Sequence, residues 1–258
     1  MITPATNNAN KAIAVLKSLE SGDPAAITQW VNQDKYIQHN LNFSSGREAM
    51  LGAMDQLTQA GTKVDIKRVL VDGDIVALHT DYNFFGPKAG FDIFRFENGQ
   101  IVEHWDNLQD KVERTPSGHT MFDGPTEIVD LDKTEENKAL VKNFIQDVLM
   151  GQNPDKLRSY INENKYIQHN PAVADGLSGL GAYLESMAKQ GIEMKYKKIH
   201  IVLGQGNFVL AASEGTFGGE HTSFYDLLRI ENGKIVEHWD VNETILPKEK
   251  WANENGKF

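Results

Sequence analysis

An internal repeat constrains the fold of this chain more than any other feature. The hexapeptide KYIQHN occurs at residues 35–40 and again at residues 165–170. A longer phrase recurs as ENGQIVEHWD at residues 97–106 and as ENGKIVEHWD at residues 231–240. This period is far longer than the roughly 20–50 residues of solenoid repeats, so each copy should fold as a domain.

The repeat sets the predicted domain boundaries. We predict a first domain over residues 1–115, a linker over residues 116–133 and a second domain over residues 134–258. Prolines and glycines between the two copies are typical of such a linker. The chain of 258 residues is long enough to give each half a core of its own.

Each copy contains helical patterns followed by strand patterns. In the first copy, apolar spacing predicts helices over residues 10–19 and 47–60 with a short one starting at Pro24, then strands over residues 63–71, 75–85, 91–96 and 101–106. The second copy repeats this order, with helices near residues 135–150, 154–161 and 177–189 and strands between residues 194 and 241. Helices followed by a meandering antiparallel sheet indicate two tandem α+β domains.

Composition excludes several classes of function. The formal net charge of −10 argues against nucleic acid and against an anionic membrane surface as partners. The chain has no cysteine, which excludes disulfides, thiolate nucleophiles and cysteine-ligated metals. No basic leader, apolar signal or membrane-length apolar run is visible, and we expect a cytoplasmic protein.

The hairpin at the end of each copy decides which polar side chains face together. Alternation groups Val102, His104 and Asp106 on one face of the last strand. With a two-residue loop at Asn98-Gly99, the partner residue Asp92 would face with Trp105. With a three-residue loop and a bulge, Asp92 would instead face with His104 and Asp106, and we favour this arrangement.

These motifs together resemble a known family. YIQHN after two helices, D-x-x-R in a strand and a terminal G-x-I-V-E-H-W-D are similar to the SnoaL-like polyketide cyclase family, of the nuclear-transport-factor-2-like superfamily. The resemblance covers nearly the whole of both copies. It implies a cone-shaped domain, a curved antiparallel sheet packed on about three helices in a cystatin-like architecture. Because single-domain members often dimerise, two fused copies could form a pseudo-dimer within the chain, and further oligomerisation is possible.

The resemblance also implies a site. Asp106 and Asp240 match the position of the family's acid/base aspartate. Desolvation in an apolar pocket would raise the pKa of such a carboxyl, which could then remove a proton next to a carbonyl group. The candidates for polarising that carbonyl are four histidines, His39, His104, His169 and His238.

A second group of residues is predicted to contact the substrate. Its members are polar or aromatic residues of the repeated motifs and of the neighbouring strands: Asn40, His79, Asp81, Asp92, Phe94, Trp105, Asn170, Asp226 and Trp239. The copies differ here, because His79 aligns with Ala212 and Asp81 with Glu214. The two sites could therefore differ in ligand, or one site could be inactive.

Structural explanations compete with these roles. Gln-His-Asn after a helix could cap the loop, and Asp92 could pair with Arg95. Trp105 and Trp239 could serve in packing instead of ligand binding. No short histidine spacing such as H-x-x-x-H supports a metal site, so we expect neither metal nor cofactor.

Two hypotheses for function follow. The first is a SnoaL-like enzyme that performs acid/base chemistry without a cofactor on a small apolar carbonyl compound. The reaction would be an aldol-type cyclisation, an isomerisation or a lyase step, so whether the chain is an isomerase, a cyclase, a lyase or no enzyme stays open. The alternative is a non-catalytic module of the same fold that binds a small hydrophobic molecule.

Overall fold

The computed structural model describes residues 4–258 and divides into two compact units. The first unit comprises Met1–Asp110 together with Leu246–Phe258, and the second comprises Lys111–Ile245. This division differs from the linear boundaries predicted above. The segment predicted as a linker packs within the second unit, and the segment after the last strand packs within the first.

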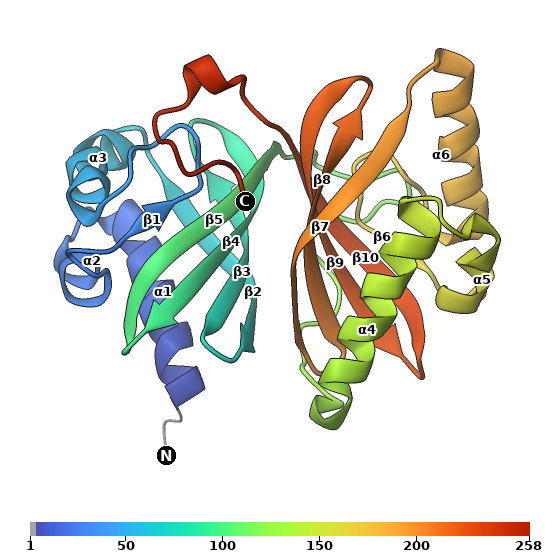
Figure 1. Ribbon diagram of the computed structural model, residues 1–258, viewed down its shortest axis with the longest axis horizontal. Coiled ribbons are helices and arrows are strands. Elements are labelled where there is room, and N and C mark those ends of the chain that lie inside the picture. Colours follow the sequence, from blue (N-terminus) through green and yellow to red (C-terminus); the bar gives the residue numbers. More distant parts are fainter. Residues whose placement is uncertain (1–3) are drawn as a thin grey trace. The chain divides into compact units, whose positions relative to one another are not determined.

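The two units repeat the same order of helices and strands (Figure 1). The first unit contains α1 (Pro4–Ser21), α2 (Ala25–Trp30), β1 (Ile37–Gln38), α3 (Arg47–Gln59), β2 (Lys63–Asp72), β3 (Ile75–Asn83), β4 (Pro87–Glu97) and β5 (Gln100–Asp110). The second contains α4 (Thr134–Phe144), α5 (Leu157–Tyr160), β6 (Ile167–Gln168), α6 (Gly176–Gln190), β7 (Met194–Gln205), β8 (Phe208–Phe217), β9 (Glu220–Glu231) and β10 (Lys234–Thr244). Short helical turns at Leu131–Lys133, Ile145–Leu149, Pro154–Lys156 and Lys248–Lys250 complete the chain.

Both sheets have five strands and the same topology. Their orders are β1-β5-β4-β3-β2 and β6-β10-β9-β8-β7, antiparallel except for the parallel two-residue strands β1 and β6. These short strands lie within the two KYIQHN copies and were not predicted. Ile37 and Gln38 pair with Glu103 and His104, so the two repeated phrases are neighbours in the sheet.

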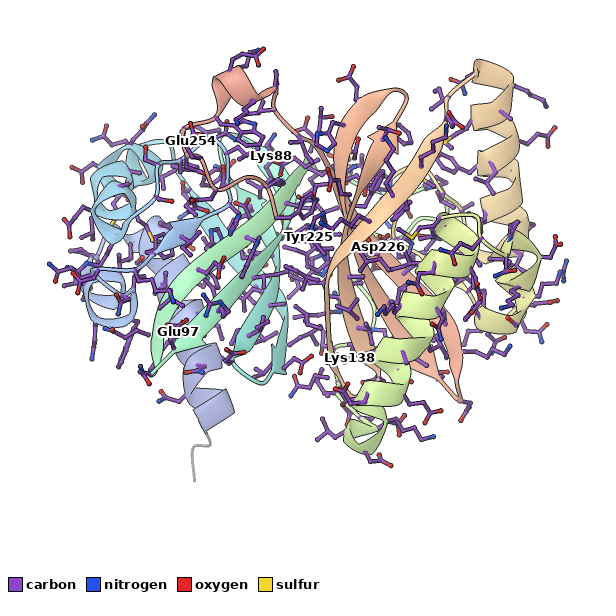
Figure 2. All side chains as sticks on the ribbon, viewed as in Figure 1. Lys88, Glu97, Lys138, Tyr225, Asp226 and Glu254 are labelled. Carbon is purple, nitrogen blue, oxygen red and sulfur yellow. The ribbon has the colours of Figure 1, made fainter. Side chains whose placement is uncertain are left out.

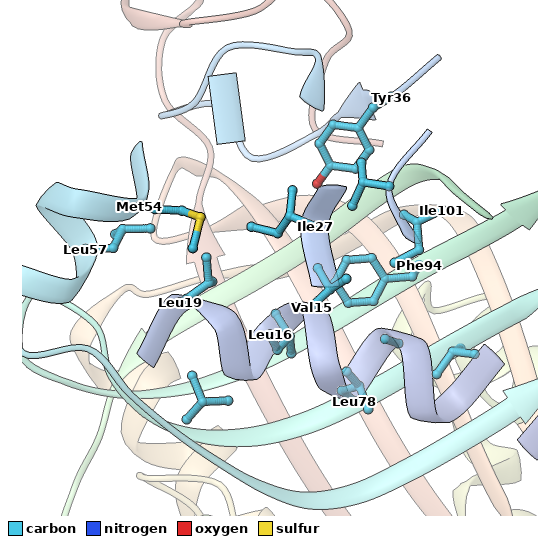
Figure 3. Packing of buried hydrophobic residues seen from close by; sticks show 14 of the residues in the cluster. Val15, Leu16, Leu19, Ile27, Tyr36, Met54, Leu57, Leu78, Phe94 and Ile101 are labelled. Carbon is cyan, nitrogen blue, oxygen red and sulfur yellow. The ribbon is translucent and has the colours of Figure 1, made fainter. Parts of the chain in front are cut away.

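The core of the first unit lies between its helices and one face of its sheet (Figure 3). The apolar stripe of α1 includes Val15, Leu16 and Leu19, all buried. It packs with Leu78 and Phe94 of the sheet, and α2 and α3 close the cluster with Ile27, Met54 and Leu57. The second unit has an equivalent cluster. Among the described residues, no helix combines the length and apolar character needed to cross a membrane.

The β4–β5 hairpin confirms the favoured face but not the favoured loop. Asn98 and Gly99 both have positive φ values, 49° and 76°, and Glu97 pairs with Gln100 across a two-residue turn. The extra residue lies one pair further on, because Arg95 pairs with Glu103 and leaves Val102 as a bulge. This bulge restores the phase in which Asp92 lies directly opposite Asp106. The β9–β10 hairpin has the same kind of bulge. It lies at Val236, between the pairs Ile230–Ile235 and Arg229–Glu237.

Candidate functional site

The first unit contains a cavity between its helices and the face of its sheet that carries Tyr82, Asp92 and His104. Its volume is about 70 Å³, several times the ~10–15 Å³ that one ordered water occupies. Most of the wall is apolar and comes from α1, α3 and the residues around Phe43 and Phe84. Apart from Ser44, the polar residues of the wall are Tyr36, Gln38, Asn40, Tyr82, Asp92, His104 and Asp106, which are called here the acid/base cluster. The cavity therefore suits a small, largely apolar molecule with one polar group.

Asp92 and His104 form the centre of that cluster. His104 Nε2 lies 2.9 Å from Asp92 Oδ1, and the Tyr82 hydroxyl donates to Asp92 Oδ2 at 2.5 Å. The ring of Phe94 stacks on His104, with 4.7 Å between the ring centroids. All four side chains are buried. Burial raises the pKa of Asp92, and the hydrogen bond from His104 opposes this only in part.

The hydrogen bonds determine where the protons of His104 lie. The backbone N–H of Asn40 donates to Gln38 Oε1, which identifies that atom as the amide oxygen. His104 Nδ1 lies 2.9 Å from the same oxygen and must therefore carry a proton. The remaining proton is shared between His104 Nε2 and Asp92 Oδ1, either as imidazolium with carboxylate or as imidazole with carboxylic acid. The pair can thus give a proton to a ligand oxygen or take one back.

Asp106 is the second carboxyl group of the cluster. Asn40 Nδ2 donates to Asp106 Oδ2 at 2.6 Å, and Lys257 Nζ lies 3.5 Å from Asp106 Oδ1. Asp106 and Lys257 are both buried, with exposed fractions of 4% and 3%. Asn40 of the repeated hexapeptide thus contacts Asp106, while its predicted contact with a substrate stays a prediction, and Lys257 was not predicted at all.

The second unit assembles an equivalent cluster. His238 Nε2 lies 2.8 Å from Asp226 Oδ1, and Asn170 Nδ2 donates to Asp240 Oδ2 at 2.6 Å. Figure 2 labels Asp226 on β9 next to Tyr225, and the two neighbours point to opposite faces of the strand. The hydroxyl of Tyr196 donates to Asp226 at 3.1 Å. His238 Nδ1 faces Gln168 Oε1, as His104 faces Gln38 in the first unit.

The tyrosine that donates a hydrogen bond to the buried aspartate lies on a different strand in each unit. Tyr82 lies on β3, where it pairs with Val64 of β2. Tyr196 lies on β7, where it pairs with Gly215 of β8. The large side chain has thus moved to the neighbouring strand, and its partner position has become small. Both arrangements deliver a hydroxyl to the same carboxyl group.

Several predicted residues lie away from the cavity. Trp105 alternates with His104 along β5 and faces the opposite side of the sheet, where it stacks on His39 with 4.9 Å between the ring centroids. His39 Nε2 contacts Glu103 at 2.9 Å instead of the cluster. His169 and Trp239 repeat this stack in the second unit, with 4.7 Å between their centroids. The structure does not bring these four residues to the acid/base cluster.

His79 and Asp81 also face away from the cavity. They alternate with Tyr82, which lines it, so strand geometry places them on the opposite face of β3. His79 stacks on Phe91 and lies 3.3 Å from Arg68 Nη1. The proposed Asp92–Arg95 pair does not form either, because Arg95 binds Glu97 and Glu103 on the other face.

Each cluster resembles a metal site only in composition. One ligand atom from each of Asp92, His104 and Asp106 lies within 4.8 Å of the others, and the second unit matches. In both units, however, the histidine Nε2 that would face an ion is hydrogen-bonded to the aspartate. We therefore interpret the clusters as proton-sharing groups and assign no metal to them.

Comparison with known proteins places the chain in a family. The family model described as "SnoaL-like domain" matches residues 12–104 and 141–238, which together exceed half of the chain. The chain therefore belongs to the SnoaL-like family and contains two copies of its domain, as the motifs predicted. No curated protein matches the sequence.

Two solved structures illustrate what the chain is similar to. One is a Bacillus cereus protein provisionally named as a polyketide cyclase, with 21% identity over 41% of this chain and 76% of its own, at a TM-score of 0.37. Another is a nuclear-transport-factor-2-like protein of unknown function from Mesorhizobium loti, with 21% identity over 42% of this chain and 94% of its own, at a TM-score of 0.36.

The pH dependence of stability should reveal the buried carboxyl group of the second unit. Burial raises the pKa of Asp240, against the opposing charge of His238. Because the folded pKa lies above the unfolded value, Asp240 contributes stability below about pH 4 that is lost as the pH rises through the folded pKa. Asp240→Asn keeps an oxygen for Asn170 and should therefore raise the free energy of unfolding by on the order of 1 kcal/mol at neutral pH.

Urea denaturation at pH 3.5 and pH 7.5 would check this prediction. The gain from Asp240→Asn should be present at pH 7.5 and absent at pH 3.5. A gain of equal size at both pH values would show that the substitution acts through packing. Asp155→Asn, at an exposed position near α5, serves as the control and should change neither value.

Proposed function

We propose that the chain is an enzyme that transfers protons on a small apolar carbonyl compound without a cofactor. The observation that carries this proposal is the position of Asp106 and the His104–Asp92 pair at one polar spot of an otherwise apolar cavity. A carboxyl group beside a proton-sharing pair at one spot is an arrangement that acid/base catalysis can use.

The reaction can be written with the residues of the first unit. Asp106 removes a proton from the carbon next to the carbonyl group, and the electron pair of that C–H bond moves to form an enolate. The His104–Asp92 pair supplies a hydrogen bond or a proton to the enolate oxygen. Where the enolate is conjugated with a C=C bond, Asp106 can return the proton to the far carbon, which gives isomerisation. Attack of the enolate carbon on a second carbonyl group instead forms a C–C bond and an alkoxide, and the alkoxide takes the proton from Asp106 to complete an aldol-type cyclisation.

The second unit has the groups needed for the same chemistry. Asp240 corresponds to Asp106, and His238 and Asp226 correspond to the proton-sharing pair. Burial lowers the pKa of His238, but its hydrogen bond to Asp226 and the nearby Asp240 charge raise it more, and the net direction is upward. A histidine held in its charged form is a suitable donor to an enolate oxygen.

A binding function without catalysis is the competing candidate. Both oxygens of Asp106 already contact protein donors, Asn40 and Lys257. A carboxylate saturated in this way could serve only to shape a pocket that holds a small hydrophobic molecule. The two candidates differ in whether a bound carbonyl compound exchanges its protons.

Proton exchange in D₂O tests the proposal without knowledge of the natural substrate. Small apolar ketones such as cyclopentanone are incubated with the protein, and loss of the signals next to the carbonyl group is followed by proton NMR. Asp106→Asn with Asp240→Asn should reduce the exchange rate by about 100-fold or more. Asp81→Asn, on the face away from the cavity, should leave it unchanged.

Each single variant shows which unit is active. Loss of exchange with Asp106→Asn alone assigns the activity to the first unit, and loss with Asp240→Asn alone assigns it to the second. Full exchange in the double variant would contradict the proposal. Ketones that bind the parent protein and are never exchanged would favour the binding module.

A further inference from the structure

The last residues of the chain are fixed against the acid/base cluster of the first unit. Ala252 N donates to Leu41 O, and Asn253 Nδ2 donates to Asn40 O and Phe43 O. Asn255 Nδ2 donates to Gln38 O at 2.9 Å. These contacts hold the segment Leu246–Phe258, called here the C-terminal segment, along the loop that begins in KYIQHN (Figure 1).

The C-terminal segment ends by presenting a cation to Asp106. His39 Nδ1 lies 2.9 Å from the carbonyl oxygen of Gly256, and this contact fixes the residue just before Lys257. The Lys257 side chain is 2% exposed, and its Nζ is 3.5 Å from Asp106 Oδ1. A buried ammonium group is costly unless it is paired, so this placement requires the carboxylate.

The second unit offers a natural comparison. His169 Nδ1 lies 2.8 Å from the carbonyl oxygen of Thr120, and the next two residues are Met121 and Phe122. In the first unit, the contacted carbonyl of Gly256 is followed by Lys257 and Phe258. The two segments therefore match in position, with a buried methionine in place of the buried lysine.

The carboxyl groups differ accordingly. Asp106 Oδ1 faces Lys257, whereas Asp240 Oδ1 is buried and has no hydrogen-bond partner among the described residues. Asn40 and Asn170 bind the Oδ2 atoms at the same distance of 2.6 Å, and Asn242 donates a further hydrogen bond to Asp240 Oδ2 at 3.0 Å, where the first unit has Leu108 at the matching position. The charge of Lys257 is thus the main difference between the two clusters at the Oδ1 atom.

We propose that Lys257 is a positioning residue that holds Asp106 as a carboxylate and thereby makes the first unit the one that abstracts protons. The other titratable groups around Asp106 are Asp92 of β4, His104 of β5, Tyr82 of β3 and Tyr36, which precedes β1. Asp92 is a second carboxyl group, and His104 carries a positive charge only when both of its ring nitrogens are protonated. Lys257 supplies a positive charge that does not depend on the proton shared within the His104–Asp92 pair. The inference rests on the proposed function for its meaning in catalysis.

Carbon NMR of protein labelled at the aspartate carboxyl carbons tests the inference directly. The signal of Asp106 is assigned by its absence in Asp106→Asn, and its titration midpoint is measured in the full chain. Lys257→Met, the residue found in the second unit, should move the midpoint of Asp106 upward by about one pH unit or more. Lys257→Arg keeps the charge and should leave the midpoint close to that of the parent.

Three outcomes would overturn the inference. These are an unchanged midpoint in Lys257→Met, equal shifts in Lys257→Met and Lys257→Arg, and a shift of the Asp240 signal in place of the Asp106 signal. If Lys257→Met does not fold, the reciprocal measurement decides the matter. In Asp106→Asn, the labelled ammonium group of Lys257 should lose its proton at a lower pH than in the parent, and an unchanged midpoint would contradict the ion pair.

Failure of the inference and failure of the proposed function can be told apart. A midpoint that shifts as expected in a protein that never exchanges ketone protons would support the positioning role and contradict the enzyme. Exchange that depends on Asp106 but not on Lys257, with an unshifted midpoint, would support the enzyme and contradict the positioning role.

Discussion

Replacing Glu237 with glutamine should lower the free energy of unfolding by about 3 kcal/mol or more, because it removes the more deeply buried of the two carboxylates that compensate Arg229. Glu237 is 1% exposed, and its Oε2 accepts from Arg229 Nε and faces Arg229 Nη2, both at 2.7 Å. Its Oε1 lies 2.8 Å from His169 Nε2. Glutamine preserves the shape but removes the buried charge next to Arg229, which is itself only 5% exposed and keeps only the more exposed Glu231 as an ion-pair partner.

The duplicated chain supplies a matched control for this prediction. Glu103 makes the same contacts with Arg95 and His39, but the side chains of Glu103 and Arg95 are 14% and 23% exposed. Water can therefore solvate Arg95 after the change, and Glu103→Gln should cost about 1 kcal/mol. Urea denaturation of both variants checks the difference. Equal costs at the two positions would show that burial does not determine the strength of this network.

The repeated phrases were sufficient to predict the fold and the shared face of Asp92, His104 and Asp106. Amphipathic spacing gave the helices, and the Asn-Gly turns gave the last hairpin of each copy. The favoured face of Asp92 was confirmed, although the extra residue proved to be Val102 in the strand and not a longer turn. A bulge in the middle of a strand has no sequence signal as strong as a turn, so the loop was the nearest place to assign it.

Other parts of the site depend on contacts that local sequence does not encode. His39 and Gly256 are 217 residues apart, and no pattern near either residue indicates that they meet. Tyr82 and Tyr196 both donate a hydrogen bond to the buried aspartate, but they lie on non-equivalent strands. An alignment of the two copies therefore does not match one tyrosine with the other. Gln38 and Gln168, in contrast, stand inside the repeated hexapeptide and could have been found by asking which residue orients the histidine.

The sequence comparison of the two copies singled out the change from His79 to Ala212, but this change does not affect the acid/base clusters. His79 and Ala212 differ, but both lie on the face of their sheet away from the helices. The differences that do reach the acid/base clusters are the contact of Lys257 with Asp106, the contact of Asn242 with Asp240 and the exchange of Tyr82 for Tyr196. Two nearly identical motifs can therefore carry clusters with different charge, because segments outside the motifs complete them.

Gly215 should be among the positions of the second unit least tolerant of substitution. A Cβ atom built on Gly215 would lie 1.8 Å from the carbonyl oxygen of Lys195 and 3.1 Å from the ring of Phe224. The bulge between Tyr196 and Lys198 draws the β7 backbone toward β8 at this point. Gly215→Ala should therefore lower the free energy of unfolding by about 3 kcal/mol or more, since backbone atoms cannot move aside as a side chain can.

The opposite sign is expected for the same substitution elsewhere. Gly181 lies within α6, and a Cβ atom there would meet nothing within 4 Å. Gly181→Ala should raise the free energy of unfolding by about 0.5–1 kcal/mol, because alanine favours the helix. Thermal and urea denaturation of both variants would show the contrast.

A double variant tests why Gly215 is required. If the Tyr196 ring were the obstacle, Tyr196→Val would make room for alanine, and valine is the residue at the corresponding position 64 of the first unit. The nearest atom is instead the Lys195 carbonyl oxygen, so Tyr196→Val combined with Gly215→Ala should be no more stable than Gly215→Ala alone. Recovery of stability in the double variant would show that the tyrosine ring, and not the bulged backbone, dictates glycine here.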